Sequence, residues 1–121
     1  MALVFARSML PPGDGTAVMA SWDNLDESDT GPAAMEVTEY DSAVVQVIGT
    51  FNGGTVVLQG SNDGVNWATV QDIAGDAISL TAAGISSLRD LPRYLRPLVS
   101  AGTGLDIDVF LKLKRISSKR T

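Results

Sequence analysis

The sequence contains neither cysteine nor histidine. Without cysteine there are no disulfides and no thiolate metal sites, so a small domain must gain its stability from packing or from self-association. Without histidine the commonest general base, the commonest metal ligand and the imidazole-based triads are absent. We therefore expect no enzymatic activity, no catalytic residue and no cofactor.

Charged residues are few, at 19% of 121 residues, and the formal net charge is −5. A net negative charge does not favour binding to nucleic acid. The charges are also segregated: residues 23–41 hold seven acidic and no basic side chains, whereas residues 112–120 hold five basic and no acidic ones. Such segregation suits head-to-tail contacts between identical subunits, and two solvated faces would give the same pattern.

Long apolar runs are absent too. No segment reaches the roughly 20 apolar residues that a membrane-spanning helix needs. The apolar segment 1–10 lacks the basic region and the cleavage site of a signal peptide. We expect a protein that is made in a cytoplasm and contacts no membrane.

Glycine and proline interrupt the chain at short intervals, which is typical of all-β proteins. We expect an N-terminal arm and loop at 1–15, a β-sandwich domain at 16–115 and a basic C-terminal tail at 116–121. Strands are predicted at 16–22, 35–40, 43–51, 55–60, 67–72, 77–81, 94–100 and 105–114. About eight short strands indicate an antiparallel β-sandwich of jelly-roll or immunoglobulin-like type.

The last predicted strand has the clearest pattern. Leu105, Ile107, Val109, Leu111 and Leu113 alternate with Asp106, Asp108, Phe110, Lys112 and Lys114. Strict period two over ten residues indicates a strand with one buried and one exposed face.

Turn residues predict how the central strands connect. Asn52-Gly53 favours positive φ at both positions and predicts a tight hairpin. With a second turn at residues 62–64, three consecutive strands would form an antiparallel meander. Pro97 places its strand at an edge or a bulge, and residues 82–91 are predicted to form a loop because Gly84 and two serines weaken a helix there.

Two groups of polar residues resemble parts of chemical sites. Asn62, Asp63 and Asn66 offer oxygen ligands such as calcium uses, but no glutamate follows at the twelfth position, and the same residues favour turns. We interpret them as a turn. Asp106 and Asp108 could form a carboxylate pair, but they alternate with core residues, so we expect a solvated strand face and no metal site.

Aromatic and arginine side chains leave two alternatives open. Trp22, Trp67, Tyr40 and Tyr94 would suit a sugar-stacking platform, yet such aromatics are more often core, and we expect Trp67 in the core. Arg89, Arg93 and Arg96 would pair with the acidic segment, either within one subunit or across an interface.

The segment LQGSNDGVNW at residues 58–67 resembles a hairpin found in many tailed-phage virion proteins. In those proteins a short polar segment, a strand like RPLVS at residues 96–100, a glycine-rich turn and a final alternating strand with a basic end follow. Residues 43–115 are similar to that whole pattern. The resemblance implies a small capsid cement or decoration protein, that is, a β-sandwich, commonly trimeric, that sits on the capsid lattice.

A second resemblance is to discoidin-type, galactose-binding-like domains. They share the SNDG turn with its tryptophan and a strand like RYLR at residues 93–96. Those domains are usually longer and often closed by disulfides, whereas this chain is short and has no cysteine. This resemblance implies a non-catalytic glycan-binding module.

We expect a structural virion protein that binds the outside of a phage capsid, with the major capsid protein and further copies of itself, as a homotrimer, for partners. A tail or fibre component and a glycan-binding module are the alternatives. We expect the two termini to contact the capsid. An N-terminal arm with large apolar side chains is unfavourable in water, and a basic C-terminal tail can pair with acidic patches. The predicted partner-binding residues are Leu3, Val4, Phe5, Arg7, Met9, Leu10, Arg115, Lys119 and Arg120.

Overall fold

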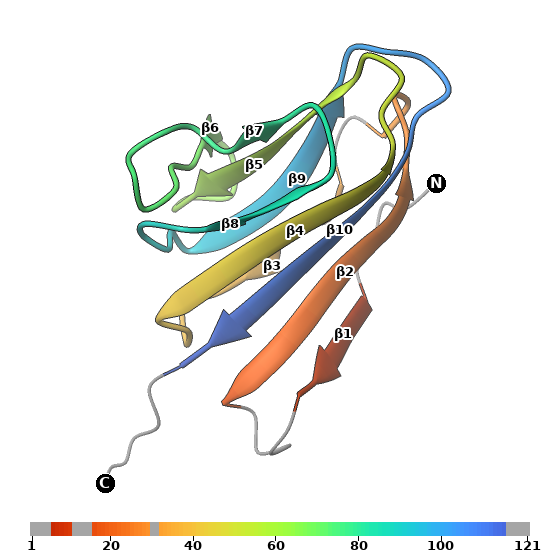
Figure 1. Ribbon diagram of the computed structural model, residues 1–121. Helices are drawn as coiled ribbons and strands as arrows, with labels where there is room; N and C mark the ends of the chain where they lie inside the picture. Colours follow the sequence, from red (N-terminus) through yellow and green to blue (C-terminus); the bar gives the residue numbers. More distant parts are fainter. Residues whose placement is uncertain (1–5, 11–15, 30–31, 116–121) are drawn as a thin grey trace, which may run out of the picture.

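The computed structural model describes residues 6–10, 16–29 and 32–115, and within them the chain forms ten strands and no helix (Figure 1). The predicted all-β class is confirmed. No helix in this part of the chain is therefore long and apolar enough to cross a membrane. The strands are β1 (Ala6–Met9), β2 (Ala17–Leu25), β3 (Met35–Glu36), β4 (Ser42–Thr50), β5 (Thr55–Ser61), β6 (Ala68–Thr69), β7 (Ser79–Leu80), β8 (Gly84–Ser87), β9 (Tyr94–Ser100) and β10 (Asp106–Lys114).

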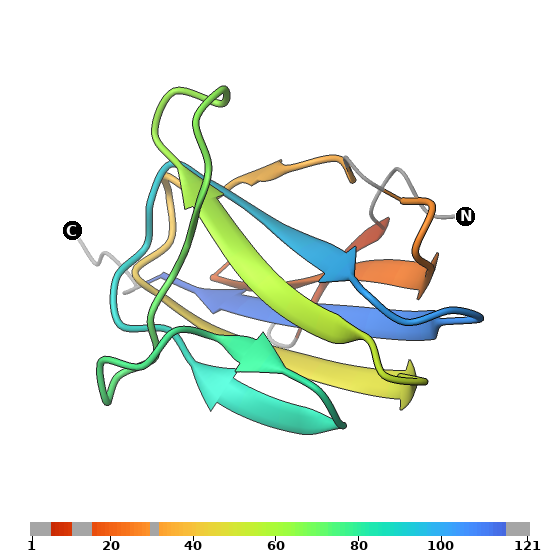
Figure 2. The ribbon, with the colours of Figure 1, turned by 90° about the horizontal axis from the view of Figure 1, so that it is seen from above.

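The strands form two antiparallel sheets that face each other, which confirms the predicted β-sandwich (Figures 1 and 2). Sheet A has the order β1-β2-β10-β4-β8. Sheet B has the order β3-β9-β5-β6, and β7 pairs with β5 beside this path. The segment between β6 and β8 connects the two sheets along one edge. The bridge Gln71↔Ala77 lies within this segment, and the bridge Asp72↔Leu88 joins it to the residue that follows β8.

Strand β10 is the central strand of sheet A and pairs with β2 on one side and β4 on the other. The five alternating apolar residues predicted for its inner face, from Leu105 to Leu113, are each at most 4% exposed. Trp22 of β2 is fully buried beside them, and its indole N–H donates to the carbonyl of Ala33 at 2.8 Å. The two inner faces thus enclose one hydrophobic core.

The predicted hairpin at Asn52-Gly53 is wrong, although its turn is present. Asn52 and Gly53 both have positive φ, at 40° and 80°, as the sequence predicted. The flanking strands do not pair with each other: β4 lies in sheet A between β10 and β8, and β5 lies in sheet B beside β9. Turn residues specify a reversal of direction but not the sheet that the next strand joins, and here the chain crosses the core at residues 51–54.

A second crossing, at residues 101–105 between β9 and β10, packs against the first one. The side-chain amide of Asn52 donates to the carbonyl of Gly104 at 3.2 Å. A Cβ on Gly102 would lie 2.7 Å from the backbone nitrogen of Gly54, so only glycine fits this contact. The two inter-sheet connections are therefore locked together at one end of the sandwich.

Two further expectations need correction. The meander is reduced to the β5–β6 pair, because β4 is in the other sheet. Residues 84–87, expected in a loop, form β8 on the edge of β4. Its four residues, with Ile85 as the one large apolar side chain, give no alternating signal. The open edge of β4, rather than a local pattern, therefore explains this strand.

The N-terminal segment is also different from the expected arm, because Ala6–Met9 forms β1 and pairs with β2. Residues 1–5, the 11–15 loop and the 116–121 tail lie outside the described residues. The expected position of Pro97 agrees with the structure. Strand β3 pairs with β9 only at Leu95 and Tyr94, so at Pro97 one side of β9 has no partner among the described strands and its missing N–H is harmless.

A pair of glycine substitutions tests the crossing geometry. At Gly49, where φ is +128°, an added Cβ would lie 2.1 Å from the carbonyl oxygen of Asp106. Gly49→Ala should lower the free energy of unfolding by more than about 2 kcal/mol, because it combines backbone strain with a backbone clash. Gly53→Ala, whose Cβ would meet nothing within 4 Å, should cost only about 1 kcal/mol. Urea unfolding of both variants measures the difference, and equal losses would contradict the predicted packing.

Candidate interaction surfaces

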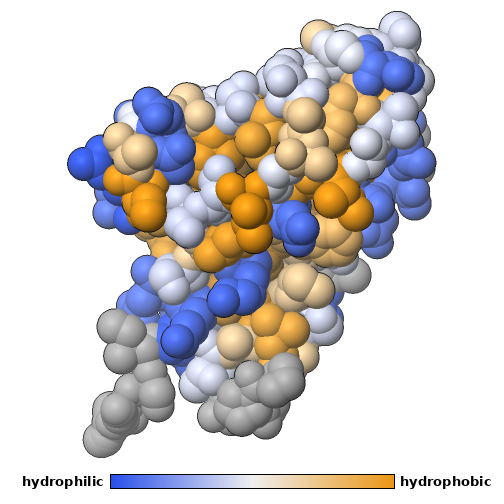
Figure 3. Space-filling model, in the orientation of Figure 1, coloured by the Kyte–Doolittle hydropathy of each residue, from blue (hydrophilic) through white to orange (hydrophobic). Residues whose placement is uncertain are grey.

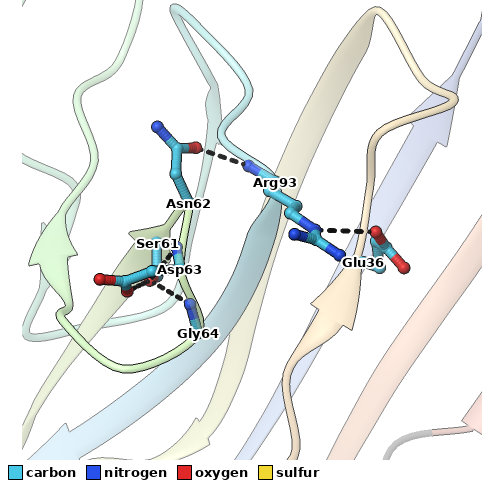
Figure 4. Close-up of polar contacts among 6 residues, drawn as sticks. All are labelled: Glu36, Ser61, Asn62, Asp63, Gly64 and Arg93. Atoms are coloured by element: carbon cyan, nitrogen blue, oxygen red, sulfur yellow. Dashed lines mark hydrogen bonds and ion pairs between the residues drawn. The ribbon is translucent and has the colours of Figure 1, made fainter.

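The turn at residues 61–66 is held by the carboxylate of Asp63 (Figure 4). It accepts hydrogen bonds from the backbone N–H groups of Val65 and Asn66, both at 2.8 Å, from the Asn66 amide at 2.8 Å and from the Ser61 hydroxyl at 2.9 Å. The Ser61 hydroxyl oxygen in turn accepts the Gly64 N–H at 2.8 Å. These oxygens serve the turn, as the sequence interpretation had it.

The same turn is fixed to sheet B. The Asn62 side-chain oxygen accepts the backbone N–H of Arg93 at 3.0 Å, and the Arg93 guanidinium forms an ion pair with Glu36 of β3 at 3.0 Å (Figure 4). The turn, β9 and β3 are thereby joined in one polar chain. Among the described residues, no group of three or more acidic side chains is placed to hold a metal ion.

Trp67 lies outside the core, which corrects the expectation for this residue. It is half-buried, just before the two-residue strand β6 at the edge of sheet B. The guanidinium of Arg96 stacks over its ring at 4.1 Å from the centroid, and the Arg96 Nε–H donates to Gln59 at 3.0 Å. A shallow groove lies beside the ring, lined in part by Asn62, Asn66 and Pro92. Trp22 and Tyr40, by contrast, are buried in the core.

A second groove lies on the outer face of sheet A, the face that points away from sheet B. Because side chains alternate along each strand, residues paired across the sheet with Phe110 of β10 share this face. In this register Phe110 lies beside Ser21 of β2 and Gln46 of β4, and Gln46 lies beside Ile85 of β8. The groove is lined by Leu10, Met19, Val44, Gln46, Ile85, Phe110 and Lys112.

This face is largely apolar in its middle. Ile85 is 65% exposed and Ile48, on the same face of β4, is 39% exposed. Figure 3 views the molecule from this side, with hydrophobic side chains over the middle of the sheet and hydrophilic ones between and around them. An apolar patch on one sheet face, bordered by charges, is the usual appearance of an interaction surface.

The predicted partner-binding residues fall in three places. Arg7 and Met9 lie in β1: the Arg7 guanidinium donates to the Tyr40 hydroxyl at 2.7 Å, and Met9 is 64% exposed. Leu10 lines the groove on the outer face of sheet A, and Arg115 forms an ion pair with Glu39 at 3.3 Å. Leu3, Val4, Phe5, Lys119 and Arg120 lie outside the described residues.

The segregated charges are partly used within the chain. Arg93 pairs with Glu36 and Arg115 with Glu39, so a basic residue meets the acidic segment in each case. The acidic loop is also tied down internally, because Glu27 accepts the N–H groups of Gly104 and Leu105 at 2.9 and 3.1 Å. These charged residues therefore stabilise the fold of a single chain. For Arg93, the predicted pairing with the acidic segment occurs within one subunit.

Comparison with known proteins identifies no relative: no protein-family model, no curated protein and no solved structure matches the chain.

The hydrogen bonds of Asp63 make the turn sensitive to acid. The N–H groups of Asn66 and Val65, then the Asn66 amide and the Ser61 hydroxyl, hold the pKa of Asp63 far below its usual value of 3.8. A carboxyl whose pKa is lowered in the folded state stabilises the fold above its unfolded pKa, and this contribution is lost as the pH falls towards the folded pKa.

Asp63→Asn should therefore be less stable than the wild type at pH 7, and the difference should shrink between about pH 5 and pH 2. Urea unfolding across this range measures it. Asp90→Asn is the matched control, because the exposed Asp90 side chain makes no hydrogen bond with the described residues. A constant difference for Asp63→Asn at every pH would contradict this assignment.

Proposed function

We propose that this protein is a non-catalytic structural component of a phage virion, which binds the outer surface of the capsid as a cement or decoration protein. The resemblance of residues 43–115 to tailed-phage virion proteins supports the class of function. The two-sheet body, with the exposed apolar residue Met9 on its N-terminal edge strand, supports a role in binding. A tail or fibre location would use the same features.

The observation that carries this proposal is the exposed edge at β1. Among the described strands, β1 is paired on one side only, with β2. The Leu10 N–H donates to the Ala17 carbonyl on that side. Because backbone N–H groups alternate in direction along a strand, those of Arg7 and Met9 point outwards.

An open strand edge with outward N–H groups is a template for a strand of another protein. Met9, at 64% exposure, supplies an apolar anchor beside it. We propose that the major capsid protein contacts this edge, with the Arg7, Met9 and Leu10 side chains at the contact. Arg115 is a weaker anchor, because Glu39 already neutralises it within the chain.

Binding to capsids stripped of the protein tests the proposal. Burying a methionine side chain contributes roughly 1.5–3 kcal/mol, so Met9→Ser should raise the dissociation constant at least about tenfold. Met9→Pro, which also removes an outward N–H, should weaken binding further. Co-sedimentation with capsids measures both effects.

Ile73→Ser is the matched control, because Ile73 is 69% exposed and lies in the segment that follows β6. It should bind capsids as the wild type does, and all three variants should keep their melting transitions. Wild-type affinity of both Met9 variants would show that β1 is not the anchor.

The groove beside Trp67 favours glycan binding as the second candidate. A half-exposed indole next to the amides of Asn62 and Asn66 is a suitable surface for a sugar ring. Trp22 is fully buried, so a change in tryptophan fluorescence on titration would report on Trp67. We expect no saturable change with galactosides up to millimolar concentration. A saturable change that disappears in Trp67→Phe would establish the glycan-binding function instead.

A further inference from the structure

The outer face of β10 has a symmetric charge pattern. Along this face the side chains are, in order, Asp106, Asp108, Phe110, Lys112 and Lys114. Two acidic residues precede the central phenylalanine and two basic residues follow it at the same spacing. Because β10 is the middle strand of sheet A, this pattern runs through the centre of the exposed face.

Such a pattern is complementary to itself in one orientation. If a second copy lies face to face, with a two-fold axis through Phe110 and perpendicular to β10, residue 110−n of one copy lies opposite residue 110+n of the other. Asp108 then faces Lys112, and Asp106 faces Lys114, twice each by symmetry. An axis parallel to β10 would instead bring like charges together.

We propose that the outer face of sheet A binds a second copy of this chain in this antiparallel orientation. The charges favour a second copy as the occupant, since every aspartate and lysine of the β10 face gains an oppositely charged partner. The packing is that of a second β-sandwich layer, in which sheets stack about 10 Å apart.

The residues beside β10 fit the same axis. Gln46 of β4 lies level with Phe110, so Val44 of one copy lies opposite Ile48 of the other. Ile85 of β8 lies level with Gln46 and therefore opposite Ile85 of the second copy. Phe110 meets Phe110. The apolar side chains are thus brought together, and the charges lie towards the ends of the interface, as in protein interfaces generally.

The size of the face sets the expected strength. Strands β2, β4 and β10 have nine residues each, and β1 and β8 have four each. At about 3.3 Å per residue and 4.8 Å per strand, they cover on the order of 550 Å² per copy. This lies below the roughly 800 Å² per partner of a standard stable interface. We therefore expect a weak dimer that dissociates at micromolar concentration.

This inference does not rest on capsid binding, which we assign to the edge at β1, although Leu10 of that contact also lines the groove on the outer face of sheet A. A two-fold contact closes at two copies, so it yields a dimer. The trimer that the phage resemblance implies would need another surface. The number of subunits in the oligomer therefore distinguishes the dimer from the trimer.

Sedimentation velocity over a range of protein concentrations measures dimerisation. The test substitutes one acidic and one basic residue of the β10 face. Asp106 and Lys114 are the better pair to change, because Asp108 already accepts the Asn24 N–H at 2.9 Å. Asp106→Lys and Lys114→Asp should each weaken the dimer at least tenfold, since each places two like-charged pairs across the interface. A mixture of the two variants should form a heterodimer, and the variant carrying both changes should dimerise as the wild type does.

Three controls keep the test specific. Asp90→Lys changes the net charge as Asp106→Lys does but lies off this face, so it should leave the dimer intact. Phe110→Ser should abolish the dimer and keep the melting transition. Added salt should weaken the wild-type dimer. A wild-type monomer at all concentrations up to millimolar, a trimer, or failure of the mixture and the double variant to restore pairing would each overturn the proposal.

Discussion

The two-faced strand β10 is the constraint on which the rest of the structure depends. Its inner face supplies Leu105, Ile107, Val109, Leu111 and Leu113 to the core, each almost fully buried. Its backbone pairs along nearly its whole length with β2 and with β4. A shift of one residue in either ladder would move the buried set to the outer face and place aspartates and lysines in the core. The register of three strands is thereby fixed by one sequence pattern.

The crossing connections turn this single sheet into a sandwich. Both β4 and β10 join sheet B through connections at the same end, and these connections touch through Asn52, Gly54 and Gly102. Gly54 also lies against the side chain of Leu105, at the entry to β10. The inter-sheet geometry thus rests on close backbone contacts that only glycines allow. This explains why the local turn at Asn52-Gly53 has hairpin dihedrals without making a hairpin.

Prediction from the sequence succeeded for strands whose residues alternate regularly. It failed for segments whose structure depends on contacts with other strands. The strand at residues 105–114 and its buried face follow from strict alternation. Strand β8 does not, because Ile85 is its one large apolar residue and it forms on the open edge of β4. The β4–β5 pairing was wrong because turn chemistry is local, whereas the choice of sheet depends on the whole core.

The candidate surfaces divide in the same way. The turn role of Asp63 was predictable from residue types that bond their local backbone. The exposure of Trp67 was not, because it depends on where sheet B ends and on Arg96, which is 29 positions away in the sequence. The β1 edge was placed in a detached arm, since the four residues Ala6–Met9 show no pattern that distinguishes a strand from a tail.

The two faces of sheet A show how the same chemistry serves fold and association. On the inner face, apolar side chains alone are enough to hold the two sheets together, because both sheets belong to one covalent chain. On the outer face a uniformly apolar surface would bind non-specifically, since nothing would fix the orientation of a second layer. Aspartates at one end of β10 and lysines at the other penalise every orientation that brings like charges together. In the dimer that we propose, the charges on the outer face select the orientation, and Phe110, Val44, Ile48 and Ile85 stabilise it. In the same way, the register along β10 selects the arrangement that the core stabilises.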